Sequence, residues 1–411
     1  MGYLELDLNI SGEAKAMHET AKEFAMKVMR PAGIELDRMA DPADVIAKGS
    51  VLWDVIKGYR ELGLHRATIP KDFGGMAEDL DPKAGPLIAQ EMGYGDTGLA
   101  ISLGASGFPM AFAAMSPEPK LQQLVRDYCE DKKGEIIGCW AITEPDHGSD
   151  WVMSAVPSFN DPRCTPQVRA VLKGDEYILN GQKAAWVSNG TIATHACLHV
   201  SLDPSKGMQG TGLAVVPLDV PGISRGKPLN KLGQRPLNQG EIIFEDAKLP
   251  KGHMIITDGA TMSAVSKMIV TNANGGMGMT FIGLAQAVYD ESLKYARERI
   301  QGGVPIFEHK NIKLQLFDMF IKIEATRALV RRVVGYNTTL APAGSSVHAV
   351  AAKVLATRTA FEVANEAVSI FGGNGLSREY VIEKFFRDAK ASMIEDGENN
   401  ALCMAAAEDL I

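Results

Sequence analysis

The segment 369–400 reads SIFGGNGLSREYVIEKFFRDAKASMIEDGENN and combines a glycine turn, an amphipathic helix and a cluster of carboxylates. Apolar residues recur at helical spacing before it, and the glycines of FGGNG then predict a turn where backbone can approach a ligand closely. A second helix is predicted to restart after Ser377 and to end near Ile394. It delivers three carboxylates around Gly397, namely Glu395, Asp396 and Glu398. One of them is a candidate base, although an acidic triplet is more often a solvated helix end.

Length and charge bound the class of protein. A chain of 411 residues, 46% of them hydrophobic, exceeds the usual size of one core, so two or three packed subdomains are expected. The net charge of −8 and the dispersed Lys and Arg residues disfavour a nucleic-acid binder and favour small-molecule partners.

Cysteine usage and the absence of an apolar leader point to the cytoplasm. The five cysteines are far apart and form no CxxC pair, so neither a disulfide framework nor a metal site is expected. The first residues, MGYLELDLNIS, lack the apolar region of a secretory signal. Two uncharged stretches, 97–117 and 268–289, are interrupted by Gly, Pro or polar residues, so we interpret them as buried core rather than membrane spans.

Periodicity divides the chain into three predicted domains, 1–136, 137–250 and 251–411. The first is mostly helical, beginning with Ser11 as an N-cap, and Pro31 is predicted to end that first helix. The second has β-branched and aromatic runs separated by turn signals, and the third returns to helical spacing. The fold class is therefore α+β, and the lack of strand and helix alternation disfavours a doubly wound parallel sheet.

The middle domain begins with a hairpin pattern. Residues 171–172 and 177–179 are predicted as strands around a turn at 173–175, and Asn180 with Gly181 is predicted to form the next turn. Further strands are expected at 196–200, 213–218 and 242–245.

Two stretches of the middle domain contain residues that ordinary core packing does not explain. WAITEPDHGSD, residues 140–150, places hydroxyls and a glycine at the close of a strand, where they can hold polar cofactor atoms. LNGQKAAWVSN, residues 179–189, is predicted to put Trp186 and Ser188 on one side of an extended strand, which suits a flat ring. Ordinary loop chemistry is the alternative for both. GGMGMTFIG from Gly275 lacks the spacing of a dinucleotide fingerprint.

Six motifs in order extend the pattern along the whole chain: TEPDHGSD, NGQKAAWVSNG, KLGQR, YARERIQGGVPI, FGGNG and FRDAK. Together they resemble the acyl-CoA dehydrogenase family of flavoproteins. The resemblance implies an N-terminal helical domain, a central β-barrel-like domain and a C-terminal four-helix bundle, assembled as a dimer of dimers. It also implies FAD, an acyl-CoA substrate and an electron-transferring flavoprotein as the acceptor.

The resemblance also assigns site residues. Ser188 stands where a Thr usually donates toward flavin N5, and Arg299 matches an arginine that meets the FAD phosphates across a subunit interface. The implied cofactor-binding residues are Thr143, Ser149, Trp186, Ser188, Arg299, Gln301, Gly372, Gly373 and Asn400.

Departures from the family pattern are informative. Gly302 replaces a Phe, and Asn274 stands where many relatives have an Arg near the substrate. The family's IYEGT is IEDGE here, so Asp396 falls on the position of the catalytic Glu, with a side chain shorter by one methylene. Some relatives place the base on the helix after the β domain, but residues 259–289 contain no Asp or Glu.

The expected reaction is α,β-dehydrogenation of an acyl-CoA, with Asp396 taking the α-proton and flavin N5 the β-hydride. Small residues at 98–105 indicate either room for a cyclic, branched or aromatic acyl group or close helix packing. A nitroalkane-oxidase-like enzyme that uses the same Asp, and a non-catalytic CoA- or flavin-binding relative, stay open. Replacement of the neighbouring Glu395 by Gln is expected to be near neutral.

Overall fold

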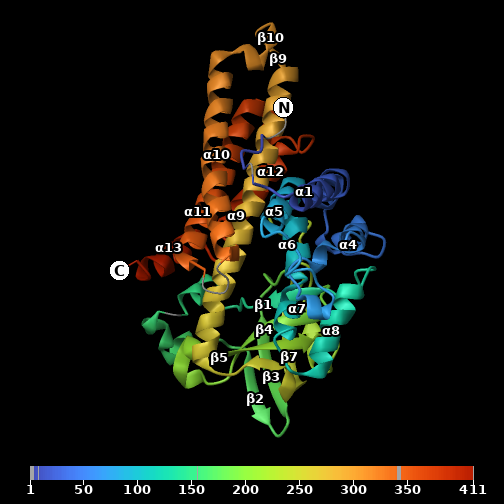
Figure 1. Cartoon of the computed structure of the whole chain (residues 1–411), viewed down its shortest axis with the longest axis vertical. Coiled ribbons are helices and arrows are strands. Elements are labelled where there is room, and N and C mark those ends of the chain that lie inside the picture. The colour runs from blue at the N-terminus through green and yellow to red at the C-terminus, as the bar shows by residue number, and fades with distance from the viewer. Residues whose placement is uncertain (1–3, 8, 155, 340–343, 411) are drawn as a thin grey trace.

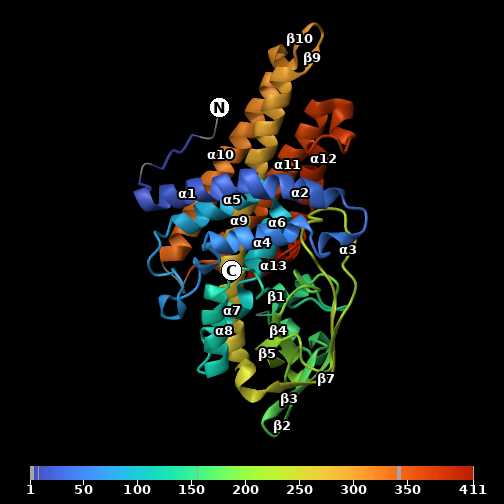
Figure 2. The same ribbon diagram turned by 90° about the vertical axis from the view of Figure 1, so that its right-hand side faces the viewer.

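A computed structural model describes residues 4–7, 9–154, 156–339 and 344–410. The sheet domain forms one end of the molecule, one long helix over residues 259–298 runs from it to the other end with two further long helices beside it, and the N-terminal helices lie across the middle (Figures 1 and 2). The predicted order of helices, sheet and helices is confirmed.

The N-terminal part is helical from Ser11, whose hydroxyl accepts the N–H of Ala14. The first helix does not end at Pro31 as predicted, because a π-helical turn joins α1 to α2 and places Pro31 in the first turn of α2, where its missing N–H is tolerated. The helices are α1 (Gly12–Phe24), α2 (Arg30–Arg38), α3 (Pro42–Val45), α4 (Val51–Glu61), α5 (Ala84–Gly95), α6 (Thr97–Ala105), α7 (Phe108–Ala113) and α8 (Pro119–Glu130).

Eight strands of the described residues form one sheet in the order β6-β7-β3-β2-β4-β5-β8, with β1 parallel to β4. They are β1 (Gly138–Ala141), β2 (Arg169–Lys173), β3 (Glu176–Lys183), β4 (His195–Ser201), β5 (Thr211–Pro217), β6 (Ile223–Arg225), β7 (Ile242–Pro250) and β8 (Met254–Ile256). The expected strands at 196–200, 213–218 and 242–245 correspond to β4, β5 and β7.

The β2–β3 hairpin has the predicted register, with Val171 opposite Ile178. The turn predicted at Asn180 and Gly181 is wrong, because both residues lie inside β3. The pairing of β3 with β7 shifts there, and Gly181 adopts φ 129°. The glycine therefore allows an irregularity within a continuous strand.

The C-terminal part is a bundle whose outer end carries a small hairpin (Figure 1). Its elements are α9 (Gly259–Glu298), β9 (Ile300–Gln301), β10 (Val304–Pro305), α10 (Lys310–Thr339), α11 (Ser346–Phe371), α12 (Ile382–Ser392) and α13 (Asn399–Glu408). Along the described residues, no helix is long and apolar enough to cross a membrane.

Helix α5 holds the N-terminal helices against α9 at very short range. A Cβ on Gly93 would lie 2.0 Å from the Thr280 carbonyl oxygen, and one on Gly283 would lie 2.0 Å from that of Gln90. Because neither position tolerates a side chain, the two glycines fix the contact between these domains. The proposed boundaries at 136 and 250 stay a prediction, and β8 joins the sheet just beyond the second.

Candidate active site

Residues 393–398, here called the carboxylate loop, connect α12 to α13. The N–H groups of Ile394 and Glu395 both donate to the carbonyl of Ala391, which closes the end of α12. Asp396 then adopts φ 50° and Gly397 φ 92°, so the chain turns sharply between the two helices. The sequence therefore places its carboxylates on a constrained turn rather than on a solvated helix end.

Glu398 and Ser149 fix the far side of this loop. The Glu398 carboxylate accepts the N–H groups of Asn400 and Ala401, so it is the N-cap of α13. The Glu398 N–H donates to the Ser149 hydroxyl oxygen at 2.8 Å, which ties the loop to the sheet domain. Ser149 can still donate its own proton elsewhere, whereas Asn400 is exposed and donates its amide to Glu398.

Lys353 on α11 supports the loop from beneath. Its fully buried side chain donates to the Gly397 carbonyl at 2.8 Å and to Asn399 Oδ1 at 3.0 Å. Burial lowers the pKa of Lys353 to about 8, although Asp396 and Glu395 act in the opposite direction. The lysine thus places a positive charge near the carboxylates. It also donates hydrogen bonds to the Gly397 carbonyl and to Asn399 Oδ1.

Asp396 is partly buried, and burial raises its pKa above the usual aspartate range, opposed by the Lys353 charge. No hydrogen bond engages its carboxylate within the described part of the chain. By contrast, the Glu398 carboxylate caps α13 and the Glu395 carboxylate accepts a hydrogen bond from Gln234. A carboxylate with a raised pKa and free oxygens is suited to accept a proton from a ligand.

Glu395, one of the three candidate carboxylates, makes a contact that the sequence does not predict. Its carboxyl accepts a hydrogen bond of 2.5 Å from the side chain of Gln234 in the KLGQR motif. Burial and then the neighbouring Asp396 raise the pKa of Glu395 to about 8. The KLGQR motif by itself does not indicate this contact, and nothing in the sequence pairs residues 161 positions apart.

Lys231 of the same motif connects this region to the candidate flavin contacts. Its ammonium donates to Gln239 Oε1 at 2.7 Å, and burial lowers its pKa to about 7. Gln239 in turn donates to the Trp186 carbonyl at 3.1 Å and the Ser188 hydroxyl at 3.4 Å. A polar chain thus links the two predicted flavin contacts to the neighbourhood of Glu395.

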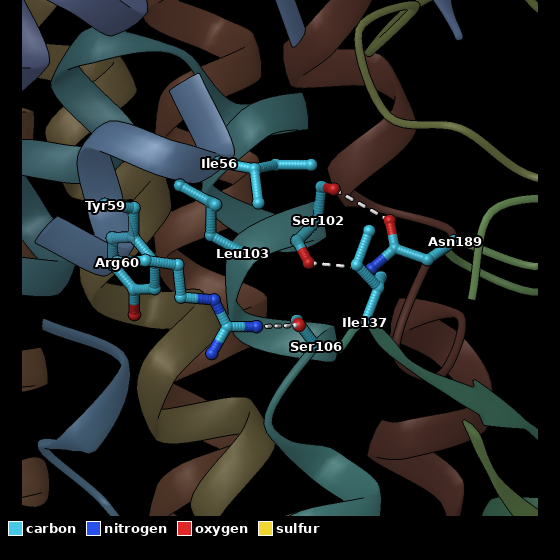
Figure 3. A pocket seen from close by; sticks show the side chains of 8 residues that line it. All are labelled: Ile56, Tyr59, Arg60, Ser102, Leu103, Ser106, Ile137 and Asn189. Atoms are coloured by element: carbon cyan, nitrogen blue, oxygen red, sulfur yellow. Dashed lines mark hydrogen bonds between the residues drawn. The ribbon is translucent and has the colours of Figure 1, made fainter. Parts of the chain in front are cut away.

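Trp186 and Ser188 do not lie on a strand as predicted, because β3 ends at Lys183, Trp186 follows in a turn and Ser188 forms an isolated antiparallel bridge with Gln239. The turn is held from behind by Asn189, a buried residue with φ 63°. Asn189 accepts from Ser102 Oγ at 2.7 Å and donates to the Ser102 carbonyl at 2.8 Å (Figure 3). The result leaves Trp186 56% exposed, an uncovered aromatic face beside a hydroxyl.

Thr143 follows β1 in a loop fixed by a buried ion pair. Lys183 donates to Glu144 Oε1 at 2.6 Å and to the Ile142 carbonyl at 3.0 Å, and both side chains are fully buried. The Thr143 carbonyl accepts the N–H of Ala184, which joins this loop to the turn that carries Trp186. The predicted contacts Thr143, Trp186 and Ser188 are thus on connected segments.

A cavity of about 300 Å³ adjoins the carboxylate loop. It lies between α9, α11, α13 and the segment after Ser149, and its walls include Val152, Val270 and Leu402. A Cβ on Gly397 would lie 2.8 Å from Leu402 Cγ and 3.0 Å from Val152 Cγ1, so the loop closes directly on the cavity wall. One turn beyond Val270, buried Asn274 has an Oδ1 that no hydrogen-bond donor of the described chain reaches.

Arg299, Gln301, Gly372 and Gly373 lie elsewhere. Arg299 and Gln301 are exposed at the hairpin end of the bundle, remote from the sheet (Figure 1). The two glycines are also exposed and follow Phe371, whose ring stacks on Tyr295 with 3.9 Å between centroids. These four residues therefore gather near the outer end of α9 and do not meet Trp186 within one chain.

Models of the three domains of one protein family match successive parts of the chain. They are the N-terminal, middle and C-terminal domains of acyl-CoA dehydrogenase, over residues 11–132, 139–247 and 264–411. The chain belongs to the acyl-CoA dehydrogenase family. It is an oxidoreductase of that family, as the resemblance implied.

Relatives of known name cover nearly the whole chain. Cyclohex-1-ene-1-carbonyl-CoA dehydrogenase of Syntrophus aciditrophicus is 28% identical over 98% of this chain and 91% of its own. The structure of butyryl-CoA dehydrogenase from Megasphaera elsdenii has a TM-score of 0.85 and 27% identity, covering 98% of this chain and all of its own. A structure described as the electron-transferring flavoprotein of Acidaminococcus fermentans has a TM-score of 0.84 and 28% identity, covering 99% and 100%.

FAD is the cofactor of this acyl-CoA dehydrogenase. The accessible side chains of Trp186, Ser188 and Ser149 fit this cofactor. The open face of Trp186 suits the flat flavin ring, and the Ser188 and Ser149 hydroxyls have protons to donate to its polar edge. When bound, FAD supplies a two-electron hydride acceptor.

Proposed function

We propose that the protein dehydrogenates an acyl-CoA between its α and β carbons, with Asp396 as the base. The observation that carries this proposal is that the three carboxylates of the carboxylate loop have different contacts. Glu398 caps α13 and Glu395 accepts from Gln234, which leaves Asp396 with free oxygens and a raised pKa. Asp396 would take the α-proton, and bound FAD would supply the acceptor for the hydride of the β carbon, so the substrate would gain one C=C bond.

The chain's own residues bind and orient the reactants. Lys353 and Ser149 hold the carboxylate loop in place, so the Asp396 carboxylate need not reorganise as it takes the proton. We assign the 300 Å³ cavity beside the loop to the thioester arm of the substrate, since a cavity of this size suits a slender ligand.

The acyl group is the finer part of the proposal. The relatives named for cyclohexene-carbonyl-CoA and butyryl-CoA favour a CoA thioester with a short or cyclic acyl group. Two of the small residues have packing explanations. A Cβ on Gly98 would lie 3.2 Å from the Gln234 carbonyl oxygen, and the Ser102 hydroxyl donates to Asn189. These positions therefore support close helix packing rather than extra room.

We also propose that FAD lies between subunits and that reduced FAD passes its electrons to an electron-transferring flavoprotein. The placement of Arg299 and Gln301 at the exposed outer hairpin supports a site completed by a second copy. The similarity to the Acidaminococcus structure supports the acceptor.

The decisive experiment is anaerobic mixing of the purified holoprotein with a panel of CoA thioesters, followed by flavin absorbance. We expect bleaching by at least one short or cyclic acyl-CoA, and faster reoxidation by a ferrocenium-type acceptor than by oxygen. Hydrogen peroxide from nitroalkanes, with no thioester bleaching the flavin, would favour the oxidase. A protein that takes up FAD but is bleached by neither class would be the non-catalytic relative.

A further inference from the structure

Glu395 adjoins the proposed base and is held by a hydrogen bond from Gln234. The side chains of Glu395 and Asp396 extend from consecutive residues of one tight loop. Gln234, whose own N–H donates to Asp388 Oδ1 at 2.5 Å, holds the Glu395 carboxyl through its side-chain amide. Because Gln234 is 98% buried with φ 49°, this contact is fixed by the fold rather than by a mobile surface chain.

Charged groups face Glu395 from three sides. Asp396 lies on its own loop, Lys353 reaches it from α11, and Lys231 from the segment 226–241. From α12, Asp388 stands behind Gln234 and is already bonded to Lys384. Among these acidic groups, Asp396 is the one whose charge raises the pKa of Glu395, and the lysines are held at the Gly397 carbonyl and at Gln239.

Two adjacent carboxyl groups in a partly buried site do not both ionise readily. We propose that Glu395 is a positioning residue that carries the proton of this pair, keeps Asp396 as the ionised base, and stops dehydrogenation when it ionises at alkaline pH. The inference rests on the proposed function. No bond changes at Glu395 during turnover, since the substrate proton goes to Asp396.

Charge repulsion explains the inhibition. As the α-proton leaves, negative charge develops on the thioester, and stabilisation of that charge determines the rate. A neutral Glu395 leaves this charge undisturbed, whereas an ionised Glu395 adds a second negative charge beside it. Burial and Asp396 raise the pKa of Glu395 to about 8, so the rate is expected to fall above that pH.

The test is the pH profile of the flavin-reduction rate with the best thioester of the panel. For the parent we expect a fall of about tenfold per pH unit above pH ~8. Glu395→Gln keeps the acceptor for Gln234 and cannot ionise, so its profile should stay flat there. At pH 7 the two proteins should differ by less than about threefold.

Two variants control for unrelated effects. Glu379→Gln neutralises an exposed carboxylate and should keep the parent profile. Gln234→Leu removes the hydrogen bond that lowers the pKa of Glu395, so the fall should move to higher pH. The same alkaline fall in the parent and in Glu395→Gln would overturn the inference, whereas absence of bleaching in both at pH 7 would instead reject the proposed function.

A readout without substrate gives an independent check. Because Glu395 keeps its proton in the folded state and loses it near pH 4.5 when unfolded, it binds one more proton when folded between those limits. The stability it contributes is present at low pH and is lost as the pH rises toward 8. The melting temperature of Glu395→Gln relative to the parent should therefore rise across pH 5 to 8, and a constant difference would contradict the inference.

Discussion

Asp396 has a backbone conformation that few non-glycine residues adopt, with φ 50°. Aspartate and asparagine tolerate this region better than other residues, so Asp396→Asn should preserve the loop. Removing the base should slow flavin reduction by about 10²- to 10⁴-fold, because that is the usual contribution of a general base. Stopped-flow bleaching measures the loss, and FAD content should stay at the parent level.

The outcome of that substitution also bears on the other carboxylates. Bleaching by Asp396→Asn at the parent rate would reject Asp396 as the base, and Glu395 would be examined next because Glu398 is committed to capping α13. Asp396→Glu restores a carboxylate on a longer side chain, so partial activity is expected, with a preference for slimmer acyl groups.

At this scale the sequence predicted chemistry through resemblance and missed contacts made by the fold. Asp396 and the candidate flavin contacts are predicted because their motifs occur in a fixed order, and these assignments stay predictions. The role of Glu395 depends on Gln234, and that of Lys353 on the Gly397 carbonyl. Neither pair shares a motif, and no periodicity connects them. Contacts of this kind become visible only once α11, α12 and the sheet domain are packed together.

At the scale of the elements, Lys353 on α11 holds the carboxylate loop, which follows α12 in the sequence. Lys353→Met removes the side-chain donor to the Gly397 carbonyl and one of the two donors to Asn399 Oδ1, the other being the Thr357 hydroxyl, which should cost about 1–3 kcal/mol of stability. Lys353 also lowers the pKa of Asp396, so its loss should raise that pKa further. Asp396 would then ionise only at higher pH, and the acid limb of flavin reduction should move upward.

Thermal unfolding and the pH profile of bleaching measure the two effects of Lys353→Met. Lys294→Met, on the exposed side of α9, is a matched control and should change neither. An unshifted acid limb in a destabilised Lys353→Met protein would show that the lysine is structural only.

Element prediction succeeded where local rules decide and failed where tertiary contacts do. Ser11 caps α1 as expected because its hydroxyl bonds within one turn. Pro31 was misread because the π-helical turn before it lets the helix continue, with Arg30 bonded to the Gly95 carbonyl at 2.8 Å. Gly181 was misread because pairing with β7 keeps it in a strand. The order of strands in the sheet likewise had no local signal.

On the scale of the whole molecule, the outer face of α10 is apolar and uncovered in one chain. Its large apolar side chains with at least 42% exposure include Leu314, Phe317, Phe320 and Ile321. Phe317 and Phe320 stack with 6.0 Å between centroids. An apolar face of this kind beside the exposed hairpin that carries Arg299 and Gln301 is suited to contact a second copy.

Phe317→Glu tests whether that contact is needed to hold FAD. A charge on this face should convert the assembly to smaller species, and these should release FAD because Arg299 and Gln301 would no longer reach the partner's cofactor. Light scattering gives the mass and absorbance at 450 nm the FAD content. Leu172→Glu adds the same charge at an exposed apolar residue of β2 and should leave both unchanged. If Phe317→Glu were a stable monomer that kept its full FAD, the cofactor site would lie within one chain, and the outer hairpin would have no part in binding it.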